Sequence, residues 1–173
     1  LSAVVVGSAN LLFTVLAMFL IDRLGRKTLL LIGAAGTSLM LFLAGFILQT
    51  QAAQWALVYV LSIYIAFFAV SQGAVIWVYI SEIFPVSVRA KGVSFGASAH
   101  WVFCSVIALV FPILAALDGA DLGFDGVRLN GSFPFYLFCL MTLVQFAVVF
   151  VFYPETKGVP LELVREKMKW GKS

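Results

Sequence analysis

Long runs of apolar residues dominate this sequence, and their length restricts the fold more than any other feature. A helix needs about 20 predominantly apolar residues to cross a bilayer. Five such runs occur, over approximately residues 1–21, 28–48, 55–80, 93–117 and 133–153. None alternates with the period of a transmembrane strand, so the runs predict helices. We therefore expect an all-α integral membrane protein with five spans.

The remaining composition argues against enzymatic chemistry. Hydrophobic residues make up 63% of the chain, well above the roughly 45–50% of soluble domains. Cys104 and Cys139 lie inside apolar runs and lack the spacing of metal ligands. No nucleophile–base pattern and no phosphate-binding glycine loop is evident. We expect no enzyme activity, no metal and no cofactor.

The positive charges lie almost entirely on one side of the predicted membrane. Ten of the 11 Lys and Arg residues fall within 22–27, 81–92 and 154–173, whereas the opposite joints hold only Arg128. The positive-inside rule places the basic joints, and a tail at 154–173, in the cytoplasm. The distribution of these charges therefore indicates how the protein is oriented in the cell membrane. The net charge of +3 does not point to a nucleic-acid partner.

The predicted topology is incomplete for a whole protein. Five spans with a cytoplasmic tail make the first helix begin outside, and residue 1 is not Met. We expect this chain to be the C-terminal piece of a longer one.

The third run is interrupted by polar and small residues. Ser71, Gln72 and Gly73 break an otherwise apolar helix that Pro85 then ends. A polar interruption in a membrane span is typical of a transporter binding site. We expect it to loosen the helix locally.

Three short motifs follow the predicted helices in order. They are "DRLGRK" at 22–27, "SEIFPVSVRAKG" at 81–92 and "PETKG" at 154–158. Together they resemble the loop signatures of the sugar porter family of the major facilitator superfamily. The resemblance covers essentially the whole chain and implies that its spans are helices eight to twelve of a twelve-helix transporter. The N-terminal half and the seventh helix would then be missing partners within the same transporter.

The resemblance also implies a salt-bridge latch at the inner side. In the family, these motifs hold helix ends together when the carrier faces outward. Arg26 with Glu82 is expected as the central contact, flanked by Arg89 and Glu155. The full predicted cluster is Asp22, Arg23, Arg26, Lys27, Glu82, Arg89 and Glu155. The alternative is that the bases only anchor topology, although that rule does not ask for acids.

A sugar site is implied by the same resemblance. Asn10 and Trp77 match sugar-contacting positions of the eighth and tenth helices, and His100 stands where members often carry Asn or Gln; Gln72 is a weaker candidate. Amides and imidazoles can satisfy sugar hydroxyls, and an indole can stack on C–H faces. His100 lies about 14 Å into its helix, near the midplane. Each residue has a simpler reading as helix packing or interhelical hydrogen bonding.

The sequence departs from the family at two places. Many members have "GPGPIPW" where this chain has "SQGAVIW", and Ala69 stands where some carry Glu. His100 adds a group that titrates between pH 5 and 8 and leaves sugar specificity open.

The expected function is alternating-access transport of a sugar or polyol. Coupling to protons or sodium is left open. The alternatives are a carrier for another small solute, such as an organic acid or a drug, and a channel or a non-transporting membrane-packing subunit.

Overall fold

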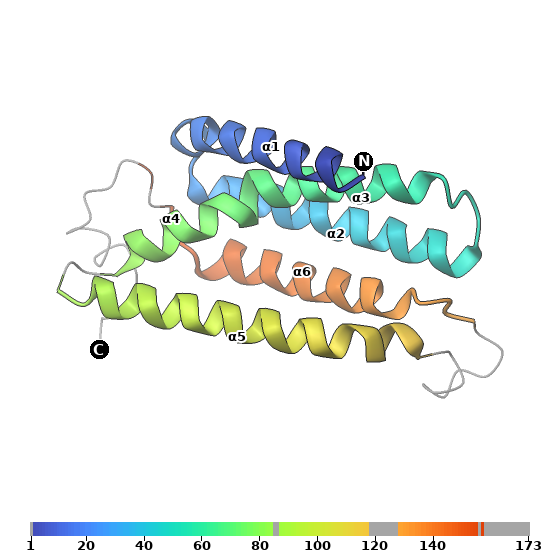
Figure 1. Ribbon diagram of the computed structural model, residues 1–173. Helices are drawn as coiled ribbons and strands as arrows, with labels where there is room; N and C mark the ends of the chain where they lie inside the picture. Colours follow the sequence, from blue (N-terminus) through green and yellow to red (C-terminus); the bar gives the residue numbers. More distant parts are fainter. Residues whose placement is uncertain (1, 85–86, 118–127, 156, 158–173) are drawn as a thin grey trace.

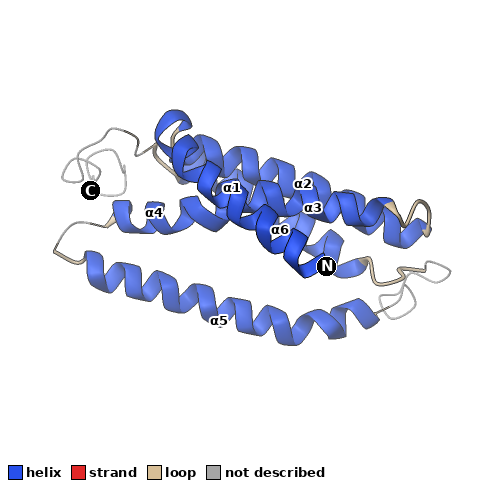
Figure 2. Cartoon of the chain, turned by 45° about the horizontal axis from the view of Figure 1, so that its top comes forward, coloured by secondary structure: helices blue, strands red, loops and turns tan. Residues whose placement is uncertain are grey.

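The computed structural model describes residues 2–84, 87–117, 128–155 and 157. All the secondary-structure elements in these ranges are helices, joined by short loops (Figures 1 and 2). The elements are α1 (Ser2–Leu24), α2 (Arg26–Thr50), α3 (Ala56–Phe68), η1 (Ala69–Gly73), α4 (Ala74–Ile83), α5 (Arg89–Ala116) and α6 (Phe133–Phe152). Most of the expected tail, residues 158–173, lies outside the described residues.

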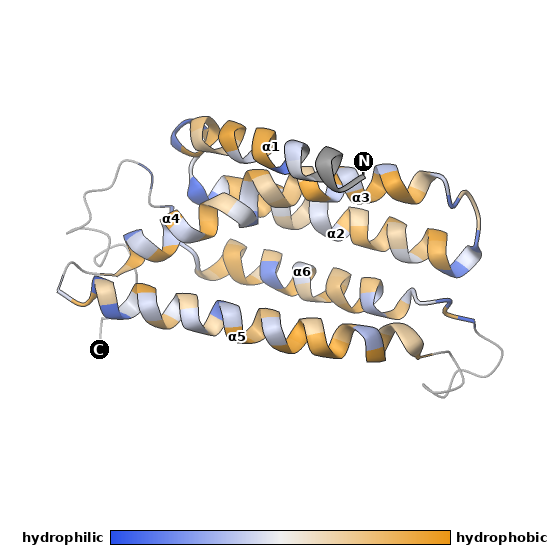
Figure 3. Ribbon diagram, in the orientation of Figure 1, coloured by the Kyte–Doolittle hydropathy of each residue, from blue (hydrophilic) through white to orange (hydrophobic). Residues whose placement is uncertain are grey.

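The helices coincide with the apolar runs of the sequence, as the hydropathy colouring shows (Figure 3). Within the described ranges, four spans are long and apolar enough to cross a membrane. They are α2, the continuous run from α3 through η1 to α4, α5, and α6. The apolar run at 1–21 falls on α1, of which several side chains lie outside the described part. The fold is that of an all-α membrane protein.

Helix α2 lies at the centre of the bundle, with α6 and α3 as its main neighbours. Its buried face carries small residues, among them Gly33, Ala34, Gly36 and Ala44. A Cβ at Gly33 would lie 1.6 Å from Ser71 Oγ, so the absence of a side chain allows this close approach. Small residues let the backbones of membrane helices approach closely. This packing matters because lipid tails are as apolar as leucine side chains, so there is no hydrophobic driving force between the helices.

The third span contains a π-helical segment, η1, at the expected polar interruption. Ser71 is buried there, and its hydroxyl donates to Phe67 O at 2.7 Å. Short π segments inside α-helices are frequent at functional sites. The helix loosens here without the prolines of related sequences, and α4 ends at Ile83, just before Pro85.

Helix α5 lies apart from the rest of the described bundle. It runs beside α4 and α6 and has no buried residue over its 28 residues (Figures 1 and 2). The charged starts and ends of the helices meet at one end of the bundle, where α1 passes into α2, α4 ends, α5 begins and α6 ends.

Candidate functional site

A cluster of charged residues occupies the end of the bundle where α1, α2, α4 and α6 meet. At its centre is Arg26, in the first turn of α2. Its guanidinium binds the Glu82 carboxylate through Nε at 3.2 Å and through Nη2 at 2.9 Å. The two side chains are only 14% and 17% exposed, so this pair is partly shielded from water. A two-nitrogen contact fixes the orientation of the arginine and ties α2 to the last turn of α4.

Asp22 adds a weaker contact to the same arginine. Its carboxylate lies 3.2 Å from Arg26 Nη1, but the Asp22 side chain is 76% exposed. Arg26 Nη1 also donates to the carbonyl of Ile21 at 3.3 Å. Exposed ion pairs contribute little because water screens them. The buried half of the cluster, Arg26 with Glu82, is therefore the stronger half.

Glu155 caps the start of α2. Its two carboxylate oxygens accept hydrogen bonds from the backbone N–H groups of Arg26 at 2.9 Å and Lys27 at 3.1 Å, and Lys157 N donates to the same carboxylate at 3.0 Å. The first N–H groups of a helix have no partner within the helix, and its N-terminus favours negative charge. Glu155 thus joins the segment after α6 to α2 through the backbone.

Gly25 makes this cap possible. It separates α1 from α2 with φ of +89°, a conformation that residues with a Cβ rarely adopt. A Cβ at this position would lie 2.5 Å from Glu155 Oε2. The glycine of "DRLGRK" is therefore required both by the turn and by the approaching carboxylate.

Of the other predicted members of the cluster, Lys27 and Arg89 donate to backbone carbonyls, whereas Arg23 contributes its own carbonyl oxygen. Lys27 Nζ donates to Phe150 O at 2.8 Å, and the carbonyl of Arg23 accepts from Lys157 Nζ at 2.6 Å. Arg89 Nε donates to Phe84 O at 3.3 Å. Arg89 Nη2 is buried and has no hydrogen-bond partner in the part of the chain that the structure describes. The structure thus places Arg89 beside the cluster without an acidic partner among the described side chains.

Tyr79 packs against the segment that carries Glu155. It was not identified as a site residue from the sequence. It is 2% exposed, stacks on Tyr153 with ring centroids 4.8 Å apart, and donates its hydroxyl to Pro154 O at 3.3 Å. These contacts hold the segment that carries Glu155. The sequence spacing could have indicated this role, since Tyr79 precedes Glu82 by three residues and so lies on the same face of the helix.

We expect Tyr79→Phe to lower the stability of the purified protein by about 1 kcal/mol, because it removes one hydrogen bond but keeps the stacked ring. The thermal unfolding midpoint in detergent measures the change. Tyr153→Phe is the matched control, since it keeps the stack and removes no hydrogen bond described for that hydroxyl. Equal midpoints for both variants would show that the Pro154 contact contributes nothing.

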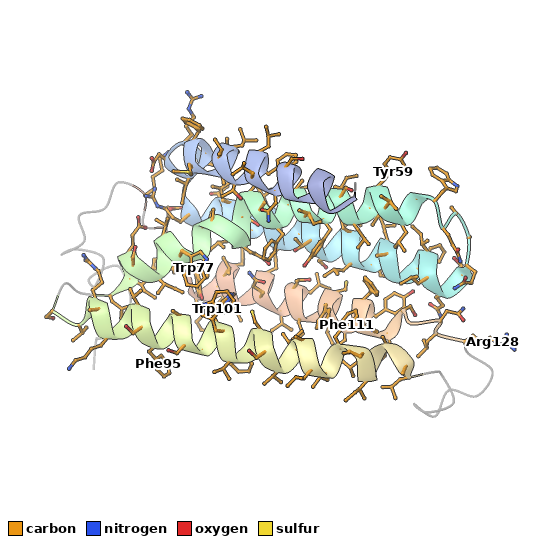
Figure 4. The ribbon with its side chains drawn as sticks, in the orientation of Figure 1. Tyr59, Trp77, Phe95, Trp101, Phe111 and Arg128 are labelled. Carbon is orange, nitrogen blue, oxygen red and sulfur yellow. The ribbon has the colours of Figure 1, made fainter. Side chains whose placement is uncertain are left out.

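A second group, the aromatic cluster, consists of Trp77, His100 and Trp101. Trp77 on α4 and His100 on α5 meet edge to face with ring centroids 5.2 Å apart, and His100 contacts Trp101 at 5.5 Å. Figure 4 shows the two tryptophans on their helices. Trp77 remains 38% exposed, and Cys104 Sγ lies 3.6 Å from His100 Nε2. The cluster presents an indole face and an imidazole together.

The structure does not bring the other two predicted binding residues into this cluster. Gln72 donates from Nε2 to Gln145 Oε1 on α6 at 3.1 Å. Asn10 is exposed on α1 and accepts from Thr14 Oγ1 at 3.2 Å. Gln145 was also missed from the sequence, although an amide within the apolar run of α6 raises the same question of its partner as Asn10 does. No group of three or more potential metal ligands lies together among the described residues.

Comparisons with known proteins relate the whole chain to membrane carriers. The family model described as "Sugar (and other) transporter" matches residues 1–168. The chain is 34% identical over 162 residues to the D-xylose-proton symporter of Escherichia coli, covering 94% of this chain and 32% of that protein. It is 34% identical over 171 residues to the putative polyol transporter 2 of Arabidopsis thaliana, covering 94% of this chain and 31% of that protein.

Solved structures show the same similarity. The inward open xylose transporter XylE from E. coli matches with a TM-score of 0.83 and 34% identity, over 98% of this chain and 36% of that chain. The proton:xylose symporter XylE bound to 6-bromo-6-deoxy-D-glucose also matches with a TM-score of 0.83, at 32% identity over 97% of this chain and 34% of that chain. The chain spans about a third of the length of the curated relatives it matches.

Proposed function

Because this chain belongs to the sugar porter family of the major facilitator superfamily, we propose that it is the C-terminal part of a carrier that moves a sugar or polyol across the membrane by alternating access. The xylose and polyol transporters among its relatives support this cargo. Five helices over residues 1–153 would form most of one six-helix half, followed by a cytoplasmic tail at 154–173. No covalent chemistry is needed for this function.

The observation that carries the proposal is the Arg26–Glu82 pair. It ties the last turn of α4 to α2, and α4 is separated from α3 by the π-helical segment η1. A helix with such a break can bend there while the two halves of the bundle rock. We therefore propose that the pair is a latch, closed when the inner gate is closed and open when α4 and α5 move away.

The unpartnered nitrogen of Arg89 supports this latch. A buried guanidinium nitrogen without an acceptor is costly, so it favours a partner outside the described residues. The proposed missing half of the carrier would supply it. Asp22, Arg23, Lys27 and Glu155 would then hold the helix ends in place around the central pair.

The aromatic cluster is the proposed sugar-contacting surface. Trp77 offers its indole to a C–H face and His100 offers ring nitrogens to hydroxyls. Gln72, which is hydrogen-bonded to Gln145, would hold η1 against α6. Asn10 lies on α1, outside the aromatic cluster, and would contact the substrate from that helix. Proton coupling is proposed by analogy with the symporters among the relatives.

We expect Trp77→Ala to lower sugar uptake at least tenfold, because it removes the stacking surface, and Trp77→Phe to retain part of it. Uptake of radiolabelled hexoses, pentoses, polyols and organic acids is measured in transporter-deficient cells that express the native-length protein. Surface expression is matched between variants. His100→Gln should keep uptake, because an amide can also hydrogen-bond sugar hydroxyls.

Two results would contradict this assignment. Uptake that is unchanged in Trp77→Ala would move the site away from the aromatic cluster. Uptake of an organic acid but of no sugar or polyol would keep the carrier and replace its cargo.

A further inference from the structure

An apolar groove runs between α2 and α6. Its volume is about 390 Å³, and it is lined by Ala35, Ser38, Leu39, Phe42, Cys139, Leu143 and Phe146. That volume lies within the range of ligand pockets in proteins. The Ser38 hydroxyl and the Cys139 thiol at its floor contact each other at 3.4 Å. Since they satisfy one another, the groove suits an apolar occupant.

The groove opens on the side of α2 that carries its large apolar residues. The exposed positions of α2 form one stripe, which includes Ile32, Leu39, Phe42 and Phe46. The buried face of α2 carries glycine, alanine, serine and threonine together with Leu29, Leu30, Met40 and Leu41. An exposed stripe of large apolar residues on a membrane helix is expected to face lipid. The groove therefore opens toward acyl chains.

A positive charge lies at one end of the contact between α2 and α6, which we call the seam. Lys27 Nζ lies 5.8 Å from the ring centroid of Phe150 and donates to the carbonyl of that residue. Phe150 stacks on Phe146, with ring centroids 6.4 Å apart and planes 4° apart, and Phe146 lines the groove. An ammonium, two aromatic rings and the groove thus follow one another along the seam between α2 and α6.

The groove lies near the middle of the bilayer if Lys27 lies at its surface. Ala35 and Phe42 lie eight and fifteen residues beyond Lys27 in α2, which places them about 12 and 23 Å along the helix axis. Half of the hydrocarbon core is about 15 Å thick, so the groove begins in the leaflet of Lys27 and extends past the midplane. A lipid phosphate beside Lys27 would therefore place the end of its acyl chain in the part of the groove near Ala35.

We propose that the seam from Lys27 to Phe42 binds an anionic glycerophospholipid, with its headgroup at the Lys27 ammonium and one acyl chain in the groove. This site is inferred from contacts and helix geometry and does not rest on the proposed transport function, although Lys27 also belongs to the charged cluster at the start of α2. Lys27 selects the headgroup by charge, and the groove holds the chain by its shape. Removing the charge should weaken headgroup selection about fivefold, the effect of one basic residue at a membrane surface.

The test uses purified native-length protein and phosphatidylglycerol that carries a photoactivatable diazirine in the distal half of one acyl chain. Phosphatidylcholine with the same chain is the comparison lipid. After irradiation, mass spectrometry of peptides locates the cross-links. We expect labelling of residues 35–42 and 139–146, about fivefold more with phosphatidylglycerol than with phosphatidylcholine.

Four variants assign the two parts of the site. Lys27→Gln should remove the headgroup preference, whereas Lys157→Gln, a basic position outside the seam, should keep it. Ala35→Phe fills the groove from an exposed position and should reduce labelling at least tenfold. Val58→Phe adds the same ring at an exposed apolar position on α3, outside the seam, and should leave labelling unchanged.

Three results would overturn the proposal. Equal labelling by the two lipids would show an unselective lipid contact without headgroup recognition. Absence of labels on the seam would show that another part of the protein or another molecule covers the groove. Equal loss in Ala35→Phe and Val58→Phe would show that the groove itself holds nothing. None of these readouts depends on transport.

Discussion

Glu82→Gln is expected to raise the apparent KM for external sugar, by up to about 30-fold. The substitution keeps the shape of the side chain but leaves the Arg26 guanidinium, on a side chain that is 14% exposed, with the exposed Asp22 as its one acidic contact among the described residues. Breaking a buried pair costs about 3–5 kcal/mol, and we expect about 2 kcal/mol here because the pair lies at the edge of the bundle. A shift of that size changes a two-state population about 30-fold.

The direction of this effect follows from the proposed latch. If the pair closes the inner gate, its loss depopulates the outward-facing state, and external sugar then binds a smaller fraction of carriers. Uptake as a function of external sugar concentration gives the KM. Asp22→Asn is the matched control, and a change below about twofold is expected because its carboxylate is 76% exposed. A Glu82→Gln variant that melts earlier at unchanged KM would make the pair a structural contact rather than a latch.

Gly25→Ala is expected to destabilise the protein by about 3–5 kcal/mol. Backbone strain at a positive φ costs of order 1–3 kcal/mol, and displacement of the Glu155 carboxylate removes hydrogen bonds worth about 1 kcal/mol or more each. The added Cβ has no space, since it would lie 2.5 Å from Glu155 Oε2. The yield of folded protein and its thermal unfolding midpoint measure the loss.

Two further variants separate strain from contact. Gly7→Ala is the control for adding a methyl group to a helix, because a Cβ at Gly7 would meet nothing within 4 Å. Gly25→Ala is also made in a Glu155→Ala background, where the carboxylate is absent. The same loss in both backgrounds would show that the turn alone requires glycine and that the Glu155 contact is not involved.

Much of the fold follows from local features of the sequence. Runs of about 20 apolar residues predict helices because the backbone must satisfy its own hydrogen bonds in lipid. Ser71, Gln72 and Gly73 predicted a loosened helix, and the structure has its π-helical segment there. The motifs with acids and bases at 22–27 and 81–92 led to Arg26 and Glu82, which the structure places in contact.

The partners of polar residues could not be predicted in the same way. Gln72 lies against Gln145, and Glu155 binds backbone N–H groups rather than an arginine side chain. Helical periodicity tells which residues share a face, but it does not tell which helix that face meets. In a soluble protein the contrast between apolar and polar faces would help. Here buried and lipid-facing positions are both apolar, so that contrast is missing.

By itself, then, the sequence determined that this protein is a helical membrane protein, since the length of an apolar run is a local property. Only the tertiary structure decided that Gly25 must admit Glu155, that Tyr79 supports the same segment, and that α2 and α6 leave a groove below Lys27. Each of these depends on the distance between residues far apart in the chain, which is set by how the helices pack.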